Sequence, residues 1–213
     1  MNDNELTTLP KDVFNTVCNQ NTSYIDLYYY YLLALDLGNN QFETLTKGVF
    51  NALSCVYQLI LEMNHLVVLP TGIFNEISNL ESLYLQHNRL KSLPNNLFNA
   101  SKNLVELNLS HNQMATLSHH LLNGLNNLMH FYFGNNLLVA LHNDVFIGLS
   151  LWLINMNGNG MVRLDTNIFK GLVTLESVYL RNNRLRHVNM DIFKDSILIK
   201  VIDLSGNQLT RCP

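Results

Sequence analysis

Four histidines are the residues whose spacing first suggests chemistry. His119 and His120 are adjacent, and His87 and His111 fall at equivalent places 24 residues apart. Imidazoles that stack on neighbouring segments can bind a transition metal. No cysteine or carboxylate shares the place of His87 and His111, however, so exposed polar turn residues are the favoured interpretation. We therefore predict no metal site.

The motifs of common catalytic sites are absent from the chain. It contains no G-x-S-x-G, no H-E-x-x-H, no phosphate-binding loop and no C-x-x-C pair. We therefore expect no catalytic residue, no cofactor and no enzymatic activity.

Composition excludes further classes of protein. The 213 residues carry a net charge of −3, so the basic surface that binds nucleic acid is not expected. The longest apolar run, near Tyr28–Leu35, is far shorter than the roughly 20 residues of a membrane-spanning helix. The N-terminal stretch MNDNELTTLPKD lacks the basic start and the apolar segment of a signal peptide.

An internal repeat dominates the sequence. Residues 80–103 and 104–127 both read L-x-x-L-x-L-x-x-N-x-L-x-x-L. The steps between successive asparagines are 24 residues, with one of 23. The asparagine recurs at Asn40, Asn64, Asn88, Asn112, Asn136, Asn159, Asn183 and Asn207.

Each repeat predicts one short strand. In an L-x-L segment alternate side chains point to opposite faces, and successive repeats stack in parallel about 4.8 Å apart. The leucines then share a core that no single repeat could close alone. The asparagine follows the strand, where its side chain can bond the backbone groups that the turn leaves unpaired.

A second column of residues supports the same register. Ten places after the asparagine the chain has an aromatic residue in almost every repeat, and Leu122 fills the one vacancy. We expect these side chains to pack in the core and seal the convex side. The phenylalanines are Phe14, Phe50, Phe74, Phe98, Phe146, Phe169 and Phe193.

This pattern resembles the leucine-rich repeat family over nearly the whole chain. The segments LKSLPNNLF and LVVLPTGIF are similar to the 24-residue extracellular subclass found in Toll-type receptors, repeat-built lymphocyte receptors and matrix proteoglycans. The resemblance implies an α/β horseshoe with a concave parallel β-sheet and an irregular or short-helical convex side. We expect a single domain over residues 1–213, with about eight repeats and partial repeats at both ends.

The two ends of the chain match the middle of a repeat. Asn4, Leu9 and Phe14 correspond to Asn88, Leu93 and Phe98, and Cys212 falls where Leu93 sits. Because solenoid ends normally carry caps, we interpret the chain as a fragment of a longer extracellular protein. The alternative is an uncapped protein that covers its ends by association, as a homo- or heterodimer.

One step breaks the period. From Asn4 to Asn40 there are 36 residues, and the excess lies in an irregular insertion within residues 15–31. Its Tyr28–Tyr31 run is a loop excursion packed on the convex side, an aromatic binding patch or a misjoined gene model. Cys18 and Cys55 could pair across the insertion, and Cys212 is either a buried apolar residue or the first cysteine of a cap.

The non-leucine strand residues are predicted to face the concave surface and to be exposed there. Tyr84, Tyr132 and Tyr179 lie two repeats apart, so about 10 Å separates consecutive rings. Tyrosine is large, rigid and polar at its tip, which suits a contact anchor. The predicted partner-binding residues are Tyr84, Tyr132, Tyr179, Asn108, Asn155, Glu106, His130 and Arg181.

These observations favour a non-enzymatic recognition module at the cell surface or outside the cell, binding a protein or glycan on the concave sheet. An innate-immune or cell-surface receptor fragment is the first interpretation, and a matrix or adhesion protein or an intracellular scaffold is the alternative. Asn21, Asn99 and Asn108 stand in N-x-[ST] sequons. If the protein is secreted, we expect glycans at Asn21 and Asn99, because a glycan on Asn108 would block the sheet.

Overall fold

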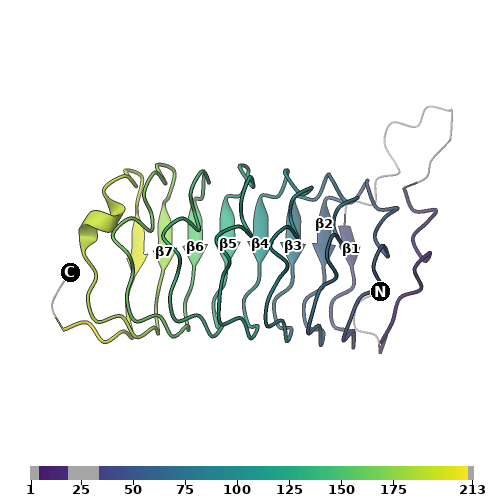
Figure 1. Ribbon diagram of the computed structural model, residues 1–213, viewed down its shortest axis with the longest axis horizontal. Helices are drawn as coiled ribbons and strands as arrows, with labels where there is room; N and C mark the ends of the chain where they lie inside the picture. The colour runs from purple at the N-terminus through teal and green to yellow at the C-terminus, as the bar shows by residue number, and fades with distance from the viewer. Residues whose placement is uncertain (1–4, 19–33, 211–213) are drawn as a thin grey trace.

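The computed structural model describes residues 5–18 and 34–210. These residues form a stack of similar repeats, and the strands of the repeats make one continuous parallel sheet (Figure 1). The sheet contains eight strands in chain order, each hydrogen-bonded to the next. The strands are β1 (Ala34–Asp36), β2 (Gln58–Ile60), β3 (Ser82–Tyr84), β4 (Glu106–Asn108), β5 (His130–Tyr132), β6 (Leu153–Asn155), β7 (Ser177–Tyr179) and β8 (Val201–Asp203).

The predicted solenoid is confirmed, including its register. Leu83 of β3 lies opposite Leu107 of β4, and the 23-residue step is absorbed without a slip, because Phe131 of β5 lies opposite Ile154 of β6. The convex side is built from turns, and the described residues contain one helix there, the 3-10 helix η1 (Met190–Phe193). No helix in the described part of the chain is long and apolar enough to cross a membrane.

The asparagine column forms a continuous ladder of side-chain hydrogen bonds. The Nδ2 group of Asn112 donates to the carbonyls of Leu109 and Ser110 in its own repeat and to Leu85 in the preceding one. Its Oδ1 accepts the N–H of Leu90, again from the preceding repeat. The same set of contacts recurs from Asn64 to Asn207, so each of these asparagines joins two repeats. Asn40 to Asn183 are buried, whereas Asn207 is only half-buried.

The phenylalanine column packs as predicted. The rings of Phe50, Phe74 and Phe98 stack with centroids 6.2–6.3 Å apart, and Leu122 is buried at the vacant place. Phe14 stacks on Phe50 at 6.3 Å although 36 residues separate them in sequence. Residues 5–18 therefore stack directly on the repeat of β1, across the predicted insertion. Most of that insertion, with the Tyr28–Tyr31 run, lies outside the described residues.

A disulfide joins the two segments that flank the insertion. Cys18 and Cys55 are bonded, with their Cα atoms 5.6 Å apart. The sequence left this pairing open, because geometry and not spacing decides it. Cys212 lies outside the described residues.

The residue before each ladder asparagine takes a left-handed backbone conformation. His87 and His111 have φ of 55° and 53°, and Asn135 has the same conformation in the next repeat. Gly158 occupies the equivalent place one repeat later, and a Cβ there would collide with the Oδ1 of Asn135. The histidines are thus exposed turn residues, as predicted from the sequence.

We expect Asn112→Ala to lower the free energy of unfolding by about 1–3 kcal/mol, because it leaves buried backbone groups of two repeats without partners. Asn207→Ala removes the same kinds of bond at a half-buried place, where water can replace them, and should cost clearly less. Urea unfolding of both variants measures the difference. Equal losses at the two sites would contradict the claim that burial makes the ladder stabilising.

The disulfide should fasten residues 5–18 to the array. It closes a sequence separation of 37 residues, so the Cys18→Ser, Cys55→Ser double variant should lose about 2–4 kcal/mol of stability. Hydrogen exchange should locate the loss in residues 5–18. Reductant must lower the melting temperature of the wild type and leave that of the double variant unchanged; a wild type that does not respond would contradict the bond.

Candidate binding surface

The strands bring the predicted binding residues together on one face of the sheet. In the pairing of β3 to β7, Tyr84 lies opposite Asn108, Asn108 opposite Tyr132, Tyr132 opposite Asn155, and Asn155 opposite Tyr179. We call this row of five residues the central column. Tyrosine and asparagine therefore alternate at every step from β3 to β7, whereas the same place carries Asp36, Ile60 and Asp203 in the other strands.

The predicted exposure of these side chains is wrong in degree. Tyr84, Tyr132 and Tyr179 are half-buried, as are Glu106 and His130 in the neighbouring column. The reason is that strands about 4.8 Å apart let a large ring lie over its shorter neighbours. Only part of each ring is open to a partner, and the rings contribute to packing as well.

The asparagines between the tyrosines are folded back on their own strands, which sequence reasoning missed. The Oδ1 of Asn108 accepts the N–H of Ser110 at 3.0 Å, and the Oδ1 of Asn155 accepts the N–H of Asn157 at 3.1 Å. These local turns fix the side chains and leave each amide NH₂ as the group that can donate to a partner. The asparagines are thus short polar positions between the aromatic ones.

Glu106 links two of the tyrosines electrostatically. The hydroxyl of Tyr84 donates a hydrogen bond to the Oε2 of Glu106 at 3.0 Å. The pKa of Tyr84 is raised, first by burial and then by the hydrogen bond to Glu106 and its charge. The pKa of Tyr132 is also raised, first by burial and then by the Glu106 charge. Glu106 therefore favours the neutral phenols and orients the Tyr84 ring.

Trp152 is an exposed aromatic residue beside the sheet that was not among the predicted binding residues. Trp152 immediately precedes β6, is 45% exposed, and meets the ring of His130 edge to face with centroids 6.3 Å apart. It is the one tryptophan of the chain, which is the signal that could have found it. Near the other end of the sheet, Ala34 and Ser82 leave a shallow hollow beside Tyr57.

Arg181 lies apart from this group. It follows β7 and is exposed, and its backbone N–H donates to the Oδ1 of Asn157 at 2.7 Å. Its charge contributes to lowering the pKa of Asp203, although the hydrogen bonds from Ser205 are the larger cause. Arg181 can therefore contact a partner only at the β7–β8 end of the sheet.

Of the two sequon residues in the described ranges, Asn108 belongs to the central column and Asn99 lies outside the sheet. Asn99 is exposed in the turn that follows the buried Phe98. Asn21 lies outside the described residues. The prediction of a glycan at Asn99 is compatible with its position.

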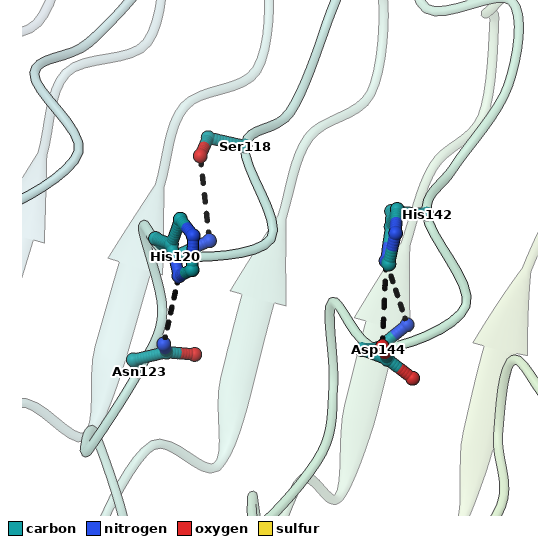
Figure 2. A network of polar contacts seen from close by, with 5 residues as sticks. All are labelled: Ser118, His120, Asn123, His142 and Asp144. Atoms are coloured by element: carbon teal, nitrogen blue, oxygen red, sulfur yellow. Dashed lines mark hydrogen bonds and ion pairs between the residues drawn. The ribbon is translucent and has the colours of Figure 1, made fainter.

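Three further histidines, His119, His120 and His142, lie outside the sheet. The His119 ring stacks on His142 with centroids 4.4 Å apart and is tilted against His120 with centroids 3.8 Å apart. The pKa of His119 is lowered by burial and then by these neighbours. Figure 2 shows that the polar contacts are local to each turn: the Ser118 hydroxyl accepts the N–H of His120, and His142 contacts Asp144. No three His, Cys, Asp or Glu side chains among the described residues are arranged to hold a metal ion.

Comparisons with known proteins support the fold. A family model described as leucine rich repeat matches residues 55–114, 102–161 and 158–209. Among solved structures, a leucine-rich repeat protein of Leptospira interrogans is 30% identical with a TM-score of 0.82, over 99% of this chain and 49% of that one. The complex of TLR13 with ssRNA13 gives 28% identity and a TM-score of 0.79, over 84% of this chain and 26% of that one.

A third structure, the Toll–Spatzle complex of Drosophila, gives 23% identity and a TM-score of 0.74, over 97% of this chain and 31% of that one, and shows the fold alone. No match was found among curated proteins. The chain thus spans between about a quarter and a half of the proteins it is similar to.

The link between Glu106 and the tyrosines can be measured by titration. Glu106→Gln removes the charge that disfavours the phenolates, so the raised pKa values of Tyr84 and Tyr132 should both fall, with the larger change at Tyr84. NMR of isotope-labelled tyrosine Cζ resolves the individual residues. Glu81→Gln, at the edge of the sheet one repeat away, is the matched control. An unchanged Tyr84 pKa in Glu106→Gln would contradict the hydrogen bond.

The raised pKa values of Tyr84 and Tyr132 also determine how the free energy of unfolding changes with pH. A phenol whose pKa is higher in the folded than in the unfolded chain stabilises the fold below the unfolded pKa. This contribution is lost as pH rises through the folded pKa. In Glu106→Gln the folded pKa values should be lower, so the loss of stability at alkaline pH should be smaller than in the wild type and should end at a lower pH.

Proposed function

The chain belongs to the leucine-rich repeat family, and we propose that it is a non-enzymatic recognition module that binds a protein partner across its concave sheet. The observation that carries this proposal is the central column, in which three tyrosines alternate with two asparagines that are held by the backbone. Such a row offers large apolar contacts separated by hydrogen-bond donors. Both are needed for a specific interface.

The geometry of the column suits a macromolecule better than a small ligand. The rings of Tyr84, Tyr132 and Tyr179 recur at every second strand, about 10 Å apart, and so extend over about 20 Å. Small ligands prefer enclosed pockets that surround most of their surface. A partner that meets all three rings must be extended or broad, as a protein surface is.

Three further residues would set the polarity of the interface. Glu106 presents a carboxylate beside Tyr84 and Tyr132, and His130 lies next to it in the same column. Arg181 adds a positive charge at the β7–β8 end. The net charge of −3 for the chain, with the Glu106 carboxylate at the middle of the sheet, favours a protein over a nucleic acid.

A location outside the cell or on its surface is supported by the Cys18–Cys55 disulfide, because such bonds persist mainly in oxidising compartments. This bond makes the intracellular scaffold the weaker alternative. The similar structures include a Toll receptor bound to Spatzle and TLR13 bound to an RNA. On this basis we extend the proposal to a fragment of an innate-immune or cell-surface receptor.

The central ring of the column gives the sharpest test. Truncating an interface anchor costs 2 kcal/mol or more, which is about thirty-fold in affinity. We therefore expect Tyr132→Ala to weaken binding to a captured partner at least that much, with Tyr84→Ala and Tyr179→Ala intermediate. Because the ring is half-buried, the variant should also lose about 1 kcal/mol of stability, which thermal unfolding measures separately.

The partner would be captured from an array of secreted and cell-surface proteins, and its affinity measured by surface plasmon resonance. Thr116→Ala, a change at an exposed residue outside the sheet, is the control and should bind as the wild type does. If all three tyrosine variants bind the captured partner normally, the concave surface is not the binding site.

A further inference from the structure

A second face of the solenoid carries a regular column of exposed residues, three places after each ladder asparagine. Backbone hydrogen bonds hold its members in register: the N–H of Val67 donates to the Glu43 carbonyl, and the N–H of Val162 donates to the Val139 carbonyl. We call this row the flank column. It begins with Glu43, continues through Val67, Lys91, Ala115, Val139 and Val162, and ends with Arg186.

Four of the seven members of the flank column are apolar, and Glu43, Lys91 and Arg186 are charged. Val67, Val139 and Val162 are 40%, 54% and 41% exposed, and in the adjoining positions Val68 and Leu137 are 52% and 58% exposed. None of these side chains belongs to the concave sheet. The exposed Lys91 separates Val67 from Ala115, Val139 and Val162, which follow one another in the column. A row of neighbouring exposed apolar side chains favours an interaction site over apolar residues scattered singly.

The two ends of the column carry opposite charges. Glu43 stands at one end, whereas Arg186 stands at the other, with Arg163 and Arg184 beside it. Within residues 5–18 and 34–210 the ion pairs join other residues, Lys200 to Glu176 and His142 to Asp144. These charges therefore remain available to a partner.

We propose that the flank column is the interface of an antiparallel homodimer. If a twofold axis passes through Ala115, Glu43 of each copy meets Arg186 of the other, and Val67 meets Val162. A parallel arrangement would instead place like charges against each other. An isologous pairing of this kind is the commonest form of oligomer, and it satisfies both ends of the column at once.

The residues nearest the axis fit this arrangement. Ala115 is small and exposed, so the two backbones can approach closely there. On either side of it Lys91 of one copy meets Val139 of the other, and the aliphatic stem of the lysine can cover the valine while its ammonium group stays in water. Leu137 adjoins the same place.

The dimensions of the strip indicate a reversible dimer. Six steps of about 4.8 Å separate Glu43 from Arg186, so the strip is about 29 Å long. In the view of Figure 1 the repeats follow one another along the longest axis of the molecule, in the order of the strands. A strip this narrow is at the small end of the interfaces that hold proteins together, which typically bury about 800 Å² per partner.

A charge exchange tests the pairing directly. Sedimentation equilibrium of the 213-residue chain should show a monomer–dimer equilibrium with a dissociation constant on the order of micromolar. Glu43→Arg and Arg186→Glu should each raise the dissociation constant of the dimer about tenfold or more, because each change places two like-charged pairs in the dimer. The double variant restores opposite charges in both places and should return the constant to within about threefold of the wild type.

Two controls separate the interface from folding and from the concave surface. Glu81→Arg, an exposed glutamate at the edge of the sheet, should leave the dimer unchanged. Tyr132→Ala should also leave it unchanged, so the dimer and the proposed partner site can fail independently. A chain that stays monomeric up to about 100 μM, or a double variant that is no better than its single parents, would overturn the proposal.

Discussion

The hydrogen bonds of the asparagine ladder are the constraint on which the other features of this structure depend. Each buried asparagine bonds the backbone of its own turn and that of the preceding repeat, as Asn88 does with Leu85, Leu61 and Leu66. An asparagine displaced by one residue would leave its amide and these backbone groups unpaired in the core, which is costly. The ladder therefore fixes the register of neighbouring repeats at the corner between the sheet and the flank.

Fixed register converts a sequence period into surface columns. Side chains 24 residues apart, or 23 at the one short step, become neighbours across a strand spacing, both in the sheet and in the flank. The central column and the flank column are both held in register by the asparagine ladder, and no exposed side chain belongs to both columns. A substitution such as Tyr to Ala in one column can thus change recognition there without altering the other column. Because the scaffold is held by buried hydrogen bonds, both surfaces are ordered before any partner binds, which lowers the entropic cost of binding.

The sequence was sufficient for the features that repeat and insufficient for those that do not. Eight asparagines in register predicted the strands, the columns and the phenylalanine stack, because each is enforced once per repeat. The Cys18–Cys55 bond occurs once and depends on distance, so spacing could not decide it. The half-burial of Tyr132 depends on what its neighbours leave uncovered, and the turn that holds Asn108 depends on local geometry. The valines of the flank column were visible in the sequence, but only strand residues were considered as a surface.

The two ends of the described array are held differently, and this bears on where binding residues can work. In a stack of repeats, stability comes from the contacts of each repeat with its neighbours, so an end repeat has about half the support of a central one. Residues 5–18 cover one end and are joined to it by the disulfide. At the other end Val201 is 39% exposed and the other two residues of β8 are half-buried, whereas the middle residue of every other strand is buried. Among the described strands, β8 is therefore the least fully packed. Tyr132 and Ala115 both belong to the middle, so the anchor of one surface and the axis of the other lie where the backbone is least able to fray.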